Sequence, residues 1–224
     1  GMVRLGVPGG DPTALPASEA VGVALPAAGW AGAALEAGER CRAVVVGPGL
    51  GRIPVTSPEV RRLVAESPVP VVVDADGLVA LDRVTDGLSA RSTVVLTPHD
   101  GEYERLYGAP PGADRIAAAE HLAASSGAVA LVKGPTTVVA DPSGRILMAD
   151  AGSPVLATAG TGDVLSGVIA AFIARGAAPA EAAALAAHVH GRAGSLGGQA
   201  GLVAGDLPDL VGRLLDQAVD DGPG

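Results

Sequence analysis

The chain has 224 residues, of which 48% are hydrophobic and 17% charged, so it can build a sizeable core and is not a disordered protein. It carries 24 acidic and 15 basic side chains, a net charge of −9, and 2% of its residues are aromatic. These values argue against a nucleic-acid partner, because contacts to phosphates need positive charge and contacts to single strands need aromatic rings. The single cysteine, Cys41, excludes a disulfide framework and a cysteine-built metal site.

The sequence predicts one domain over residues 1–224 in the cytoplasm, without a membrane partner. The most apolar stretch, residues 164–174, is shorter than the roughly 20 residues that cross a bilayer. The first eight residues lack the basic start and apolar run of a signal peptide. A single free cysteine is typical of a reducing compartment.

Four short runs of β-branched and other apolar residues predict buried parallel strands. They are residues 43–46, 69–73, 93–96 and 129–132. Helices are expected between them over residues 58–66, with Ser57 as a cap, and over residues 113–125. This alternation of strand and helix is typical of an α/β fold.

The pattern changes after the fourth run. Residues 136–140 and 145–149 flank the turn sequence D-P-S-G, which predicts a β-hairpin. Three helices are expected after it, and Pro179 and Pro208 suit the first turns of the last two. Their predicted ranges are 163–175, 179–196 and 207–219.

Polar or glycine-rich segments follow all four predicted parallel strands. They are residues 47–51, 74–77, 97–102 and 133–137. Ligands of open parallel sheets bind at the carboxyl ends of the strands, so these segments are expected to share one edge of the sheet.

The strongest candidate for chemistry is T-A-G-T-G-D, which ends at Asp163 and precedes an apolar helix. Free amides at a helix start can bind an anion, although a simple glycine turn capped by Thr161 explains the segment equally well. Asp163 favours a function, because a carboxylate about 4 Å from a phosphate costs about 4 kcal/mol at an effective dielectric of about 20. The helix terminus returns only about 0.3–2 kcal/mol. We therefore predict that Asp163 is a general base that activates a hydroxyl for attack on phosphorus.

Other candidates have common structural explanations. Lys133 and Thr137 could contact a phosphate, but a lysine beside a tight turn is usually a surface residue. His99, at a strand end, could bind a substrate or serve the fold alone. Asp74 and Asp76 belong to an Asp-x-Asp-Gly segment, where a turn is favoured for Asp74 and the role of Asp76 is open.

The familiar glycine motifs and metal motifs are missing from the sequence. It has neither a Walker A motif nor the dinucleotide pattern G-x-G-x-x-G. His188 and His190 are expected to pack or cap a helix, and no close His/Cys cluster predicts zinc.

Together these segments resemble the ADP-dependent (S)-NAD(P)H-hydrate dehydratases, the carboxyl-terminal half of bifunctional nicotinamide-nucleotide repair enzymes. The two most specific stretches are L-T-P-H-D-G-E-Y-E-R-L at residues 96–106 and A-G-T-G-D-V-L-S-G at residues 159–167. Residues 47–51, 74–77, 133–137 and 190–194 match in the same order, and the resemblance extends over about residues 2–215.

The resemblance implies a ribokinase-like fold and the repair of hydrated NADH and NADPH. ADP would phosphorylate the hydrate's hydroxyl, and loss of phosphate would restore the dihydropyridine. Asp163 would be the base, and the anion hole would be the amides of Gly160, Thr161 and Gly162. ADP or AMP would be bound by Lys133, Gly134, Pro135, Thr136, Thr137 and Gly162. The hydrated nucleotide would be bound by Gly49, His99 and Asp163, and Mg²⁺ is expected with ligands that the sequence does not name.

Family members usually begin about 50 residues earlier, with a first strand, a glycine-rich turn and a helix, so the domain is expected to be truncated at its N-terminus. A homo-oligomer is expected, for which a tetramer is one candidate. Two alternatives remain: a small-molecule kinase of the same fold, such as a hydroxymethylthiazole or sugar kinase, and a non-catalytic nucleotide-binding homologue. Residues 97–106 favour the dehydratase over the kinases.

Overall fold

The centre of the protein is a six-stranded sheet in the order β3-β4-β5-β6-β7-β8. The computed structural model describes residues 1–14, 19–52, 54–84, 86–88, 90, 93–197 and 201–220. The strands are β3 (Val44–Val46), β4 (Val71–Val73), β5 (Val94–Leu96), β6 (Val129–Val132), β7 (Thr137–Ala140) and β8 (Ile146–Ala149). Strands β3 to β6 are parallel, and β7 and β8 continue the sheet as an antiparallel hairpin. All four predicted parallel strands and the predicted hairpin are confirmed, with ends that differ by up to two residues.

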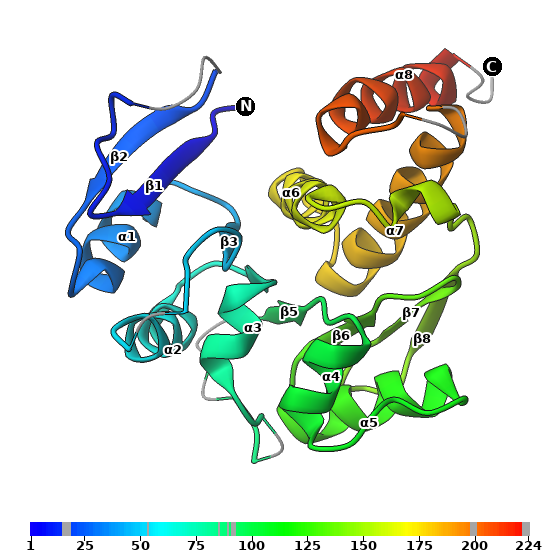
Figure 1. The fold of residues 1–224 in the computed structure, drawn as a ribbon, viewed down its shortest axis with the longest axis horizontal. Helices are drawn as coiled ribbons and strands as arrows, with labels where there is room; N and C mark the ends of the chain where they lie inside the picture. The colour runs from blue at the N-terminus through cyan, green and yellow to red at the C-terminus, as the bar shows by residue number, and fades with distance from the viewer. Residues whose placement is uncertain are drawn as a thin grey trace.

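Helices cover both faces of this sheet (Figure 1). One face carries α1 (Trp30–Gly38), α2 (Thr56–Glu66), α3 (Asp76–Leu81), α4 (Asp100–Tyr107) and α5 (Arg115–Ser126). The other carries α6 (Thr161–Ala174) and α7 (Pro179–Leu196), with α8 (Leu207–Asp220) packed outside them.

The central strands are buried on both faces because their side chains alternate between two cores. Val71 and Val73 pack in the core that includes α1 to α5, whereas Val72 packs in the core beneath α6 and α7. All three valines are fully buried. A continuous apolar run therefore fits these strands better than an alternating pattern does.

The five predicted helices are confirmed, with first residues that differ by up to two from the predicted ones, but one predicted cap is wrong. Pro179 is the first residue of α7 and Pro208 lies in the first turn of α8, as expected. Ser57 lies inside α2, because the helix begins at Thr56 after Val55, and no side chain caps it. The prediction that Ser57 is the cap is therefore wrong.

Four elements at the amino-terminal end of the chain and after β4 were not predicted. Strands β1 (Arg4–Pro8) and β2 (Val21–Leu25) form a separate two-stranded parallel sheet, followed by α1. Helix α3 begins within the segment expected to be a turn. Figure 1 shows β1 and β2 at one end of the molecule, across from α6 and α8. Within the described ranges, no helix is long and apolar enough to cross a membrane.

Candidate active site

The four segments that follow the parallel strands meet at one edge of the sheet, as predicted. The amide of Gly51 donates to the Asp76 carboxylate at 3.0 Å, which joins the loops after β3 and β4. The amide of Lys133 donates to the Pro98 carbonyl at 2.9 Å, which joins the loops after β6 and β5. The carboxyl ends of the strands therefore bring together residues that lie far apart in the sequence.

The loops after β3 and β4 cross so closely that only glycine fits at Gly47. Its φ of 132° lies in a region that other residues rarely adopt, and a Cβ atom there would lie 1.8 Å from the Asp74 carbonyl oxygen. On the opposite side of the crossing, a Cβ on Gly77 would lie 2.7 Å from the Val46 carbonyl oxygen. This crossing fixes the backbone from which the Asp74 side chain projects.

Asp74 is a buried member of an ion pair. Its Oδ1 lies 2.9 Å from Lys133 Nζ, and its Oδ2 accepts a hydrogen bond of 2.7 Å from Ser166 Oγ on α6. The side chain of Asp74 is 2% exposed and that of Lys133 is 22% exposed. The turn predicted at Asp74 is confirmed, because its carbonyl accepts from the Gly77 amide at 2.9 Å, but the prediction missed the ion pair of its side chain. The interpretation of Lys133 as a surface lysine is wrong, because its ammonium pairs with a buried carboxylate. The contacts of Asp74 join it to residues 59 and 92 positions away in the sequence, so no local pattern could predict them.

The glycine loop leads into α6 and leaves backbone donors free. Gly160 adopts a left-handed conformation with φ 88°, and no side chain caps the helix. Thr161 does not cap the helix, because its hydroxyl donates to the Leu156 and Thr158 carbonyls instead. Its amide also donates to Thr158, at 3.3 Å. Within the described part of the chain, the amides of Gly160, Gly162 and Asp163 have no hydrogen-bond partner, so they can receive an anion.

Asp163 stands in the first turn of α6, at this set of free amides. The residue is exposed, and no ion pair joins it to another side chain among the described residues. Partial desolvation raises the pKa of its carboxyl group above the ordinary value of 3.8, and the negative charges of Asp74 and Asp76 raise it further, against the lowering effect of Lys133. A higher pKa makes this carboxylate a better proton acceptor.

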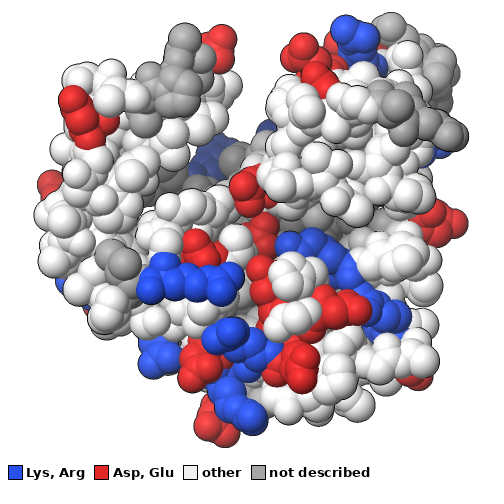
Figure 2. All heavy atoms as spheres, in the orientation of Figure 1, with Lys and Arg blue, Asp and Glu red and all other residues white. Residues whose placement is uncertain are grey.

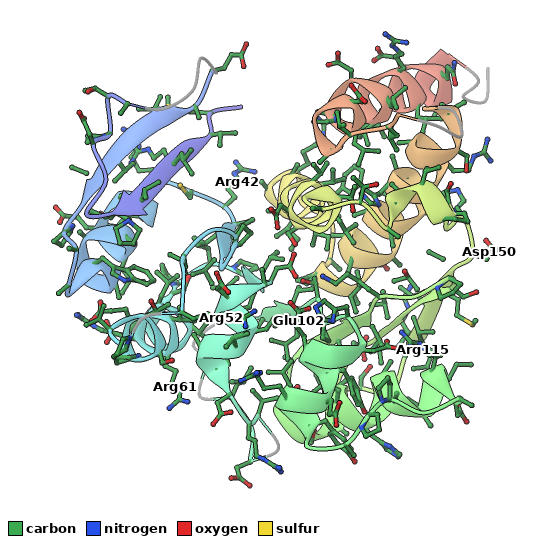
Figure 3. The ribbon with its side chains drawn as sticks, in the orientation of Figure 1. Arg42, Arg52, Arg61, Glu102, Arg115 and Asp150 are labelled. Atoms are coloured by element: carbon green, nitrogen blue, oxygen red, sulfur yellow. The ribbon has the colours of Figure 1, made fainter. Side chains whose placement is uncertain are left out.

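Helix α4 contributes a second carboxylate on the same side. His99 caps α4 by accepting the amides of Gly101 and Glu102 at Nδ1, and Glu102 accepts the His99 amide in return. The Glu102 carboxylate reaches to 3.8 Å from Lys133 Nζ. In Figure 3 Glu102 lies near the middle of the molecule, between Arg52 and Arg115. The segment from Thr97 to Glu102 therefore lies on the same side of the sheet as the Lys133 turn.

The residues predicted to bind ADP or AMP and those predicted to bind the hydrated nucleotide lie differently with respect to Asp163. Lys133 lies beside the glycine loop, because a Cβ on Gly162 would be 3.5 Å from its Nζ. Gly134, Pro135, Thr136 and Thr137 form the turn into β7 at the same edge. Gly49 adopts a left-handed conformation with open space around its Cα, and His99 is exposed. Among the described residues, no hydrogen bond or ion pair joins Gly49 or His99 to Asp163.

His190 on α7 was expected only to pack or cap. It is buried, and its Nε2 lies 2.9 Å from the Thr161 carbonyl oxygen, so it holds the first turn of α6 against α7. Burial lowers the pKa of His190 below its ordinary value of 6.5. Nε2 is the donor in this contact, because a carbonyl oxygen can only accept a hydrogen bond. His188, two residues earlier, is exposed.

A cavity of about 280 Å³ lies beside the edge, between the loop after β3 and the start of α2. The Arg52 guanidinium lines it and pairs with the Asp76 carboxylate at 3.0 Å. Figure 2 shows the surface hollowed between the two arms of the molecule, with acidic and basic side chains gathered below the hollow. Among the described residues, no group of three or more His, Cys, Asp or Glu side chains could hold a metal ion by itself.

The model of the NAD(P)H-hydrate dehydratase family matches residues 12–216. The chain belongs to this family. It is 47% identical, over 148 residues, to the bifunctional NAD(P)H-hydrate repair enzyme Nnr of Mycobacterium leprae, covering 66% of this chain and 31% of that protein. It is 42% identical, over 135 residues, to the ADP-dependent (S)-NAD(P)H-hydrate dehydratase of Cenarchaeum symbiosum, covering 56% of this chain and 46% of that one. The chain thus spans less than half the length of these two relatives.

Solved structures confirm the ribokinase-like fold expected for the dehydratase family. The ADP/ATP-dependent NAD(P)H-hydrate dehydratase of Bacillus subtilis, co-crystallised with ATP and Mg²⁺, matches with a TM-score of 0.72 and 31% identity, covering 79% of this chain and 64% of that one. A ribokinase-like protein of Enterococcus faecalis matches with a TM-score of 0.74 at 22% identity, covering 89% of this chain and 70% of that one. This second similarity concerns the fold alone.

Proposed function

We propose that this chain is a lyase that dehydrates (S)-NADHX and (S)-NADPHX to NADH and NADPH at the expense of ADP, giving AMP and phosphate. The observation that carries the proposal is the exposed Asp163 carboxylate among free amides at the start of α6, beside the Lys133 ammonium. This arrangement combines a proton acceptor with donors for a phosphoryl group. Family membership supports the choice of substrates.

In the first step, Asp163 accepts the proton of the hydrate's hydroxyl group as that oxygen attacks the terminal phosphorus of ADP. A new P–O bond forms, and the bond to the leaving AMP oxygen breaks. In the second step, the ring nitrogen's electron pair expels the phosphate as the C–O bond breaks, which leaves an iminium ion. The neighbouring ring carbon then loses a proton to the departing phosphate, and the electrons of that C–H bond form the C=C bond that restores the dihydropyridine. Phosphate is a far better leaving group than hydroxide, which explains why a nucleotide is consumed in a dehydration.

The phosphates would lie between the free amides and Lys133. The amides of Gly160 and Gly162 serve as the anion hole that the resemblance implied, joined by the Asp163 amide. The amide of Thr161 is already engaged with Thr158, so we propose no phosphate contact for it. The turn from Lys133 to Thr137 would hold the adenosine phosphate, and Gly49 and His99 would contact the hydrated nucleotide.

The charges around this place favour Mg²⁺ as a companion of the phosphates. Asp74, Glu102 and Asp163 are negative, and Lys133 is the cation that lies among them. Each further negative charge at about 4 Å costs about 4 kcal/mol at an effective dielectric of about 20, so added phosphates need a cation. Glu102 offers an oxygen ligand, and Mg²⁺ usually binds through one or two carboxylates together with substrate phosphates. When bound, the ion would neutralise charge that develops on the phosphoryl oxygens.

The proposal is tested by supplying hydrated NADH, ADP and Mg²⁺ and following the absorbance of the restored dihydropyridine. Recovery of NADH with release of AMP is expected. A stable phosphorylated product formed preferentially from ATP would indicate a kinase of this fold. Tight binding of ADP or AMP without turnover would indicate a non-catalytic homologue.

Asp163→Asn separates catalysis from binding. Turnover should fall by about 10²–10⁴-fold, the usual contribution of a general base, because the amide cannot accept the proton. The dissociation constant for ADP should stay within about twofold, since the free amides and Lys133 remain. Asp141→Asn, in the β7–β8 turn, is the matched control and should leave both quantities unchanged. Equal losses of turnover and ADP affinity in Asp163→Asn would assign Asp163 a structural role instead.

We also propose a homo-oligomer, which the low proportion of charged residues, 17%, supports. Light scattering of the purified chain measures its mass in solution directly. A monomer at assay concentration would contradict this part of the proposal.

A further inference from the structure

The Asp74 carboxylate joins three elements that are remote in the sequence. It follows β4, its first oxygen pairs with Lys133 after β6, and its second oxygen accepts from Ser166 on α6. Its backbone is held as well, because its amide donates to Val46 and its carbonyl accepts from Gly77. The carboxylate therefore has a defined position and two defined partners.

Burying the Asp74–Lys133 ion pair costs desolvation free energy, and the attraction between the two charges at best compensates that cost. Removing two charges from water is expensive, and a buried ion pair often stabilises a protein no more than an apolar pair of the same size would. The burial of Asp74 is therefore poor evidence for a role in stability. A role in placing its partners accounts better for a carboxylate whose two oxygens are both engaged.

The partner that Asp74 places is the lysine next to the glycine loop. Lys133 Nζ is 2.9 Å from Asp74 and 3.8 Å from Glu102 on α4, so two carboxylates compete for one ammonium. The nearer one holds it under Gly162, where a Cβ atom would be 3.5 Å from Lys133 Nζ and 3.7 Å from Asp74 Oδ2. Without the Asp74 contact, Glu102 would be the one acidic side chain left within ion-pair distance of Lys133 among the described residues.

Ser166 fixes the Asp74 carboxylate relative to α6. Its hydroxyl is fully buried, and it lies three residues after Asp163, within one turn of the same helix. The 2.7 Å hydrogen bond therefore links the helix that carries the free amides to the acid that holds the lysine. A charged acceptor makes this bond stronger than a neutral one would.

We infer that Asp74 and Ser166 are positioning residues of the proposed active site, which hold the Lys133 ammonium beside the α6 amides so that both meet the phosphates of ADP. The inference rests on the proposed function, but its test uses ADP binding alone. Neither residue needs to touch ADP. Ser166 is the better one to change, because its removal leaves every charge in place.

The experiment measures the dissociation constant for Mg²⁺·ADP by calorimetry in five variants. They are Ser166→Ala, Ser166→Cys, Lys133→Met, the double variant Ser166→Ala/Lys133→Met and Ser126→Ala. Ser126 is the matched control, a fully buried serine on α5 whose hydroxyl donates to the Leu122 carbonyl at 2.6 Å. Each variant's Tm is measured alongside, so that affinity and stability are read separately.

Ser166→Ala should weaken ADP binding about tenfold, the size expected for loss of a hydrogen bond to a charged group. In the Lys133→Met background the same change should alter affinity less than twofold, because the residue that Ser166 helps to place is gone. Ser126→Ala should lower Tm by a similar amount while leaving affinity within twofold. Ser166→Cys, which keeps a weak donor, should fall between wild type and Ser166→Ala.

Two results would overturn the inference. In the first, Ser166→Ala lowers Tm and leaves ADP affinity unchanged, which is a structural role. In the second, the tenfold loss persists in the Lys133→Met background, so that it does not act through the lysine. Absence of NADHX turnover in the wild type would refute the proposed function. The comparison of ADP affinities among the variants would still test this inference, because it requires only that the wild type binds ADP.

Discussion

Asp163, the proposed general base, shows at the scale of a single residue how a carboxylate can oppose stability. Its carboxyl group is partly desolvated and lies near the negative charges of Asp74 and Asp76, so its pKa is raised. The folded protein therefore binds this proton more tightly than the unfolded chain does. The resulting loss of stability is present above the raised pKa and disappears as the pH falls below the ordinary value of 3.8.

Asp163→Asn should accordingly melt at a higher temperature than the wild type at pH 7. The difference should close as the pH is lowered through the range in which Asp163 takes up its proton, because both proteins are then neutral at this position. Thermal unfolding at several pH values measures it. An equal or lower melting temperature for the variant at pH 7 would show that the carboxylate is stabilised where it stands.

At the scale of elements, the crossing of the loops after β3 and β4 leaves no room for a side chain at residue 47. Gly47→Ala would drive a methyl group into the Asp74 carbonyl in a backbone conformation that alanine disfavours. We expect a loss of about 3 kcal/mol or more in the free energy of unfolding, measured by urea denaturation. Gly112→Ala has a positive φ of 70° and open space, so it should cost only about 1–2 kcal/mol. Similar losses in the two variants would mean that the crossing can relax.

The elements that could be predicted from sequence are those with a strong local signal. Runs such as Val71–Val73 are buried on both faces, so every residue of the strand is apolar. Strand β2 is interrupted by Gly22 and buries only its last residue, Leu25, so its local signal is weaker. Helix α3 was missed because its first residues, Asp76 and Gly77, also suit a turn. In these elements tertiary packing, rather than local preference, decides the structure.

At the scale of the molecule, local pattern predicts where the loops of the candidate site lie, whereas tertiary packing decides which of their side chains pair. The rule that ligands gather at strand ends placed the four loops on one edge, and their contacts confirm it. Which side chains pair across that edge depends on register and on helix placement. The Asp74–Ser166 bond spans 92 positions, and no local pattern announces it. The turn predicted at Asp74 is confirmed, but the pairing of its side chain could not be predicted for this reason.

The small sheet of β1 and β2 is packed less tightly than the central sheet. Among the described strands, β1 and β2 pair only with each other, and large apolar side chains on or beside them are exposed. These are Met2, Val3, Leu5, Val7 and Val21. A two-stranded sheet is marginally stable in water, whereas β4 and β5 are flanked by strands and helices on all sides.

Hydrogen exchange followed by mass spectrometry should therefore separate the two sheets. Amides of β1 and β2 should exchange at least about 100-fold faster than those of β4 and β5, because local opening of the small sheet does not require global unfolding. The β7–β8 hairpin, at the other edge of the large sheet, is an internal reference. Equal protection of β1 and β4 would show that both unfold as one unit.

The reversal of direction at β7 has a practical result. Because β7 runs opposite to β6, the exposed turn D-P-S-G at residues 141–144 lies at the far rim from Asp163 and Lys133. A fluorophore or a surface tether attached at Ser143 would leave the approach to the proposed nucleotide site unobstructed. This turn is therefore a convenient handle for immobilising the protein during binding measurements.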